Sequence, residues 1–68
     1  MTAIEILKTL QKSPRLTPAM LARLLGKAPS HIRNILSVLL ELKLVQTPAR
    51  GVYEITPLGE ELLKEIAK

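Results

Sequence analysis

The sequence contains no cysteine, no tryptophan and no phenylalanine, and it has a single tyrosine and a single histidine. The absence of cysteine excludes disulfide bonds, thiolate metal sites and cysteine nucleophiles. The one histidine, His31, cannot hold a zinc ion alone, and it has no nucleophile or orienting carboxylate at a recognisable spacing for catalysis. We therefore predict a protein that is not an enzyme and that uses no metal and no cofactor.

Long apolar runs are also missing. No segment approaches the ~20 apolar residues that a membrane span needs, and residues 1–15 lack the basic start and the uninterrupted apolar run of a signal peptide. These absences predict a cytoplasmic protein with no membrane contact. We expect the 68 residues to form one small domain, residues 1–68, with no added region for a small-molecule effector. A domain of this size buries only about 60% of its unfolded surface, which favours association.

Positive charge is concentrated in the middle of the chain. Residues 8–50 contain eight lysine and arginine residues against Glu41 alone, a balance of +7, within a net charge of +4 for the whole chain. Residues 51–68 contain four glutamates against two lysines, a balance of −2. This charge is compatible with two interpretations, a surface that binds an anionic partner and an ordinary soluble surface, and it favours neither.

Start and stop signals divide the chain into four helices and a hairpin. Periodic apolar residues predict helices over residues 2–12, 18–25, 29–42 and 58–67. Thr17 and Thr56 are good N-caps, and Gly26 suits a left-handed exit from the second helix. Residues 43–56 carry β-branched residues on either side of "PARG", which indicates a short hairpin with Gly51 at a positive φ. The second and third helices form a helix-turn-helix unit, so the predicted fold class is mainly α with a small β-hairpin.

The run "LARLLGKAPSHIRNILSVLLELKLV", followed by the hairpin and "ITPLGEELL", resembles the winged helix-turn-helix domain of small prokaryotic transcription regulators of the ArsR, MarR and PadR kind. The resemblance covers residues from about 3 to 68. It implies a three-helix core, a short wing and a C-terminal helix, with helix 29–42 in the DNA major groove. Two positions depart from the pattern: Ala28 stands where a capping Ser or Thr is common, and Lys43 stands where Gly is common.

Helix 29–42 has a polar stripe opposite its apolar side, which within this fold favours contact with double-stranded DNA over an ordinary solvated face. The predicted base contacts are Ser30, His31, Arg33, Asn34 and Ser37. By family geometry, the resemblance implies backbone contacts from Arg15, Thr17, Arg23, Lys27 and Tyr53. Arg50 and Gly51 would form the wing tip, where Arg50 is either a DNA contact or a plain turn residue.

Some apolar residues lie off the predicted core stripes and suggest a dimer. On the first helix Ile4, Leu7 and Leu10 share one face and Ile6 lies beside it, while Leu58, Leu62 and Ile66 share one side of the last helix. The predicted dimer interface is Ile6, Val38, Leu40, Leu63 and Ala67. The sequence therefore predicts a homodimeric, sequence-specific transcriptional regulator. The alternative is a winged-helix module that binds another protein in a larger assembly.

Overall fold

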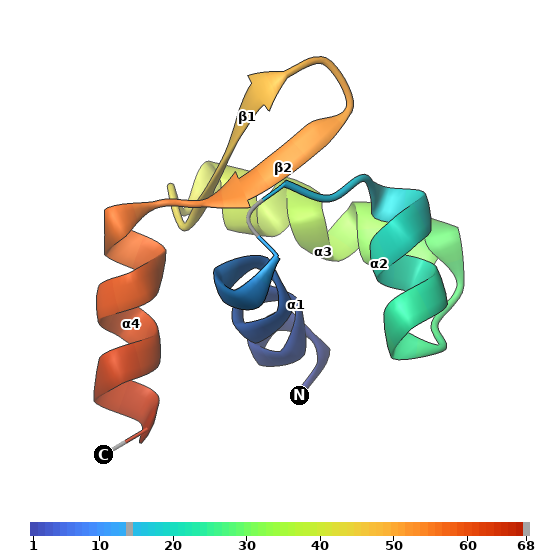
Figure 1. Ribbon diagram of the computed structural model, residues 1–68. Helices are drawn as coiled ribbons and strands as arrows, with labels where there is room; N and C mark the ends of the chain where they lie inside the picture. Colours follow the sequence, from blue (N-terminus) through green and yellow to red (C-terminus); the bar gives the residue numbers. More distant parts are fainter. Residues whose placement is uncertain (14, 68) are drawn as a thin grey trace.

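The computed structural model describes residues 1–13 and 15–67, and its elements follow the predicted order (Figure 1). These elements are α1 (Thr2–Lys12), α2 (Pro18–Leu25), α3 (Pro29–Glu41), β1 (Val45–Ala49), β2 (Val52–Ile55) and α4 (Pro57–Ala67). Every helix boundary lies within one residue of its prediction. The predicted fold class, four helices with a two-stranded antiparallel hairpin in a winged-helix-like arrangement, is confirmed.

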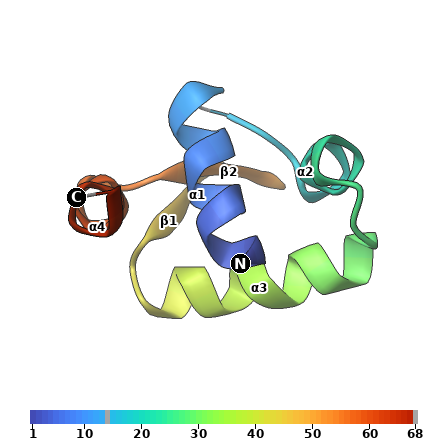
Figure 2. The same ribbon diagram turned by 90° about the horizontal axis from the view of Figure 1, so that it is seen from below.

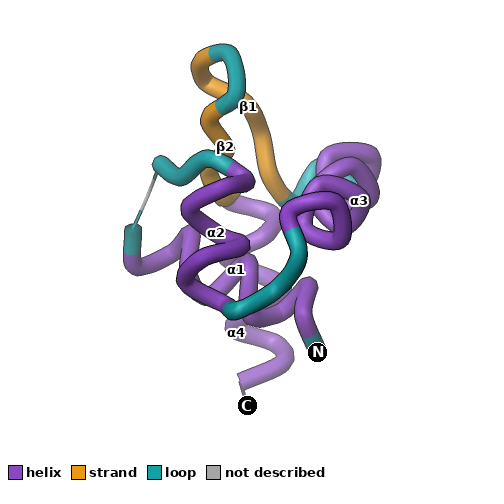
Figure 3. Tube along the Cα trace, turned by 90° about the vertical axis from the view of Figure 1, so that its right-hand side faces the viewer, coloured by secondary structure: helices purple, strands orange, loops and turns teal. Residues whose placement is uncertain are grey.

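Helix α1 is the central element of the molecule. In Figure 1 it lies between α2 and α4, and Figure 2 shows α3 running along one edge of the molecule beside it. The hairpin projects beyond the helices (Figure 3). Seven large side chains form the fully buried centre of the core: Ile6, Leu7, Leu10, Leu21, Ile32, Leu36 and Val45.

The buried face of α1 is wider than the single stripe that periodicity predicts. Ile6 is fully buried with Leu7 and Leu10, whereas Ile4 is only partly buried at the edge of the core. Helix α1 contacts α2, α3, α4 and β2, so neighbours surround most of its circumference. Ile6 therefore belongs to the core, which corrects its prediction as a dimer-interface residue.

Gly59 sets which side of α4 faces the core. Gly59 and Leu63 face inward and are buried. Glycine allows this close approach, because a Cβ at position 59 would collide with the Leu44 carbonyl oxygen and the Ile55 side chain. The close approach of α4 to this backbone turns the apolar stripe formed by Leu58, Leu62 and Ile66 outward. The core-facing side of α4 is thus set by backbone contact and not by the largest apolar side chains.

Lys43 ends α3 in the left-handed conformation that glycine usually adopts, with φ of 64°. The Lys43 N–H donates to the Leu40 carbonyl at 3.0 Å, and the Leu44 N–H donates to the Leu39 carbonyl at 3.0 Å. This pair of hydrogen bonds is a Schellman motif, and the buried residues Leu39 and Leu44 supply its usual hydrophobic contact. The left-handed exit forms although position 43 is not glycine.

Thr56 joins the end of α3 to the start of α4. Its hydroxyl donates to the Lys43 carbonyl at 2.7 Å and accepts from the Gly59 N–H at 3.1 Å. The second contact is the predicted N-cap of α4. The Thr17 cap of α2 is present as well, since its hydroxyl accepts from the Met20 N–H at 3.2 Å.

The hairpin is short and irregular at its proline. Val45 pairs with Ile55 and Ala49 pairs with Val52, and the register shifts between Gln46 and Ala49, the stretch that contains Pro48. Gly51 turns the chain with φ of 78°, as predicted. The other edge of β2 pairs with Leu16, which anchors the hairpin to the segment before α2.

Candidate association surface

The polar stripe of α3 is exposed, as its sequence pattern predicts. Ser30, His31, Arg33, Asn34 and Ser37 are all solvent-exposed. The Ser37 hydroxyl donates to the Arg33 carbonyl at 3.1 Å. The structure therefore brings these five residues together on one helix and leaves their side chains facing water.

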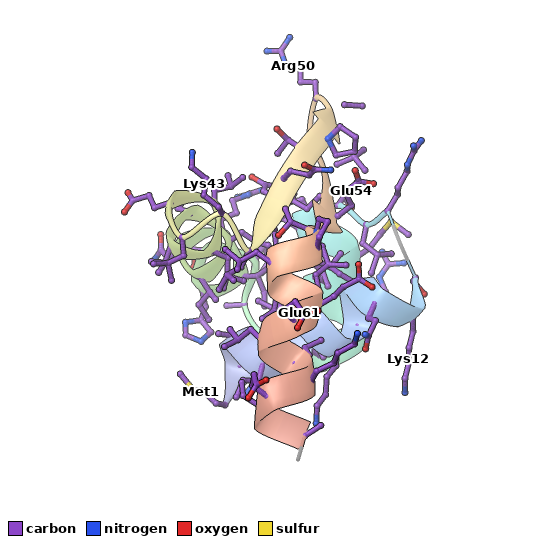
Figure 4. The ribbon with its side chains drawn as sticks, turned by 90° about the vertical axis from the view of Figure 1, so that its left-hand side faces the viewer. Met1, Lys12, Lys43, Arg50, Glu54 and Glu61 are labelled. Carbon is purple, nitrogen blue, oxygen red and sulfur yellow. The ribbon has the colours of Figure 1, made fainter. Side chains whose placement is uncertain are left out.

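The residues predicted to contact a nucleic-acid backbone are spread over several elements. Arg15 lies 3.8 Å from the Glu54 carboxylate, Thr17 caps α2, and Tyr53 is half-buried beside the core. Arg23 and Lys27 are exposed at the end of α2 and in the turn that follows it. The predicted wing-tip residues, Arg50 and Gly51, do lie at the tip of the hairpin, where Figure 4 shows Arg50 pointing away from the domain.

The five predicted dimer-interface residues separate into core and surface. Ile6 and Leu63 are buried in the core, and Leu40 is half-buried against it. Ala67 is exposed beside a small hollow between α1 and α4. Val38 is 54% exposed and lies on a large apolar surface, so it is the one large exposed side chain in this set. The prediction for Leu63 is corrected together with that for Ile6, because neither side chain is available to a partner.

An apolar groove of about 290 Å³ lies between α1, α3 and α4. Every residue that lines it is apolar. Figure 4 shows Met1 and Lys43, which follows the lining residue Leu42, on the same side of α4. The lining residues are Met1, Ala3, Ile4 and Leu7 from the start of the chain and α1, Ile35, Val38, Leu39 and Leu42 from α3 and its C-cap, Leu44, and Leu62 and Ile66 from α4.

Large side chains around this apolar groove are exposed to water. Val38 and Leu42 on one wall are 54% and 56% exposed, and Leu62 and Ile66 on the other wall are also exposed. Contiguous apolar surface of this kind is unfavourable in water and marks a site of contact with another molecule. The groove is therefore the strongest candidate for a functional surface on the described residues.

Two further hollows have different chemistry. One, of about 310 Å³, lies between α1 and α2 and is lined by Lys8, Thr9, Lys12, Ser13, Leu24 and Leu25. The other is smaller and includes the exposed side chains of Lys8 and Lys64.

Within residues 1–13 and 15–67, no three His, Cys, Asp or Glu side chains gather where they could hold a metal ion. None of the described helices combines the length and apolarity needed to cross a bilayer.

The winged-helix-like fold thus presents the apolar groove as its candidate site of contact with another molecule. A family model described as "O-methyltransferase dimerisation domain" matches residues 1–65 of the chain. The protein belongs to this family of dimerisation domains. Comparison with curated proteins finds no match, and comparison with solved structures finds none either.

This family match corrects the function expected from the sequence. The resemblance to ArsR, MarR and PadR regulators rested on a winged-helix pattern, and one fold hosts many unrelated functions. The matching family is a dimerisation domain of O-methyltransferases and not a transcription regulator, so the predictions of sequence-specific DNA binding and transcription regulation were wrong. The DNA-contact roles given to α3, the basic residues and the wing tip have no other support. The predicted homodimer agrees with the family description.

Most of the apolar groove was missed from the sequence. Leu62 and Ile66 were predicted to share one side of the last helix, and none of Ile35, Leu42, Leu62 and Ile66 was predicted to lie in the dimer interface. The signal that could have identified them is an excess of apolar positions, since α3 also buries Ile32, Leu36 and Leu39. A helix with more apolar positions than one core face needs has a second face to cover.

Proposed function

We propose that this domain is a homodimerisation module that associates with a second copy through the apolar groove and the exposed side chains around it. The single observation that carries the proposal is the groove itself, which is lined entirely by apolar residues and bordered by the exposed residues Val38, Leu42, Leu62 and Ile66. The description of the family as a dimerisation domain supports a second copy as the occupant. The proposal gives the domain a role in assembly and no chemical step.

The size of the domain fits this role. A specific interface buries at least about 1,000 Å² in total, or about 500 Å² from each partner. The accessible surface of the described chain is 4523 Å², so each copy would bury about a ninth of it. At about 25 cal/mol per Å² of apolar surface, removing such an area from water is strongly favourable before the entropic cost of association.

The groove is a shallow docking site and is too small to enclose a whole helix. Its volume of about 290 Å³ is at the lower limit of pockets that hold small ligands. It therefore accommodates a few side chains from a facing surface. In a two-fold dimer the same surface is used twice, so exposed residues such as Val38 of one copy contact the corresponding apolar surface of the other.

The proposal is tested by measuring mass against concentration with sedimentation equilibrium. We expect the wild-type chain to shift from 7.5 kDa towards 15 kDa, which is twice that mass, as its concentration increases. Val38→Glu places one charge per copy on the proposed surface and should weaken the dimer by about 100-fold, because each unpaired carboxylate must be desolvated. Glutamate is a good helix former, so the monomer fold should be retained, as circular dichroism will verify.

Leu24→Glu is the matched control. Leu24 is a large apolar residue on a helix and is 61% exposed, but it lies on α2 outside the apolar groove. Its replacement should leave the association constant within about twofold of the wild-type value. A wild-type chain that stays at 7.5 kDa up to about 1 mM would contradict the proposal, since such a dimer would be weaker than any useful one. Equal dissociation by both variants would also contradict it.

A further inference from the structure

Helix α3 carries a second stripe of side chains beside its core face. His31, Ile35, Val38 and Leu42 follow one another at spacings of four, three and four residues, and we call this stripe the α3 seam. Such spacing is typical of the contact line between two packed helices. The core face of the same helix consists of other residues, Ile32, Leu36 and Leu39, which are buried within the domain.

The α3 seam is open to a partner over the whole length of the helix. His31, Val38 and Leu42 are exposed and Ile35 is half-buried. Figure 2 shows α3 along one edge of the molecule. Ile35, Val38 and Leu42 also line the apolar groove, so a helix lying on the seam covers the α3 wall of the groove. From Ile35 to Leu42 the seam and the groove are therefore parts of one continuous apolar surface.

The two ends of α3 lack favourable charges of their own. Its N-cap, Ala28, makes no side-chain capping hydrogen bond, and its first turn contains no acidic residue. Its last turn contains no basic residue and ends with Glu41. A carboxylate is unfavourable at the negative end of a helix dipole and favourable at the positive end, where N–H groups lack acceptors. The Glu41 carboxylate at the end of one α3 can thus interact favourably with the uncapped N–H groups at the start of another α3.

We infer that two copies pair their α3 helices antiparallel across a two-fold axis between Ile35 and Val38, an inference that rests on the proposed self-association. In this register Ile35 faces the second copy's Val38, and His31 faces the second copy's Leu42. Glu41 of each copy then lies near the uncapped first turn of the other. A parallel pairing would instead bring the two Glu41 carboxylates together and leave both helix starts without an acceptor.

The natural absence of cysteine makes this register directly measurable. His31→Cys and Leu42→Cys each introduce one exposed thiol, and a disulfide forms only when the two Cα atoms come within about 7 Å. Residues 31 and 42 lie about 16 Å apart along the helix, at about 1.5 Å per residue. Antiparallel pairing therefore joins position 31 only to position 42, whereas parallel pairing joins each position only to its equivalent.

The experiment oxidises an equal mixture of the two variants under mild conditions and identifies the crosslinked products by intact mass. We expect the mixed product, one copy of each variant, to be the main species and to exceed the crosslinking of Leu24→Cys, which sets the background from random collisions. Predominant 31–31 and 42–42 products would overturn the antiparallel pairing. A background level of every product in a chain that is dimeric by mass would overturn it as well.

Glu41→Gln gives a second and independent readout. Removing the carboxylate should weaken the dimer by about 3- to 30-fold, from two ends each of ordinary helix-dipole strength. An unchanged or tighter dimer would contradict the contact between Glu41 and the second copy's helix start. A chain that is monomeric at all concentrations refutes the proposed function, whereas a dimer with the wrong crosslinks refutes only this geometry.

Discussion

Replacing Thr56 with valine tests how the domain holds its last helix in place. Thr56 is 8% exposed, and its hydroxyl makes two hydrogen bonds: one to the Lys43 carbonyl at 2.7 Å and one from the Gly59 N–H at 3.1 Å. Valine has nearly the same shape and removes both. The loss of stability in this variant therefore measures the effect of the hydroxyl and not a change in packing.

The expected cost follows from these two contacts. The net contribution of a buried hydrogen bond is about 0.5–1.5 kcal/mol, and loss of an N-cap costs about 1 kcal/mol. Thr56→Val should thus lower the free energy of unfolding by about 1.5–2.5 kcal/mol. A domain of this size has about 3–10 kcal/mol of stability in total. Each kcal/mol shifts the melting temperature by about 4–8 °C, so we expect a decrease of roughly 6–20 °C.

Thermal and urea unfolding followed by circular dichroism measure this loss. Thr56→Ser keeps the hydroxyl and should cost less than about 1 kcal/mol. Thr17→Val removes a cap with one hydrogen bond, from the Met20 N–H at 3.2 Å, and should cost about 1 kcal/mol. The reasoning is refuted if Thr56→Val costs no more than Thr17→Val, because the bond to Lys43 would then contribute nothing. All measurements should be made at one protein concentration, since dimerisation adds to apparent stability.

Three further substitutions test individual backbone features by the same unfolding assay. Gly59→Ala should destabilise the domain by about 1–3 kcal/mol, because its Cβ collides with the Leu44 carbonyl oxygen and the Ile55 side chain; a neutral result would mean that α4 shifts freely. Lys43→Gly should stabilise it by about 0.5–1 kcal/mol by relieving the positive φ of 64°, and a loss of stability would contradict that strain. Ala28→Ser should add the missing cap of α3 and about 0.5–1 kcal/mol, and no gain in stability would contradict an uncapped first turn.

Local signals in the sequence were sufficient for the order and bounds of the elements. Thr17 and Thr56 cap the helices that they were predicted to cap, and Gly26 and Gly51 adopt the positive φ predicted for them. These signals depend on groups only a few residues apart. They are therefore readable without knowledge of the rest of the fold.

The function was harder to predict, because two kinds of surface lie on the same helix. The polar stripe of α3 and the basic middle of the chain suit DNA, and a soluble helix with a solvated face has the same pattern. The predicted DNA-binding function was overturned by the match to a dimerisation domain. Apolar residues outside the main stripes did indicate a dimer, and Val38 among them does lie on the exposed apolar groove.

By itself, the sequence determined the four helices, the hairpin, the caps and the turns, since each depends on short-range hydrogen bonding and on allowed backbone angles. Only the tertiary structure decided which apolar residues are buried. Ile6 is buried because α1 is surrounded by its neighbours, and Leu62 and Ile66 are exposed because close backbone contact at Gly59 rotates α4. Hydrophobicity alone does not distinguish an apolar residue that packs in its own core from an exposed one available to contact a second copy, because burial of either is favoured by the same hydrophobic effect.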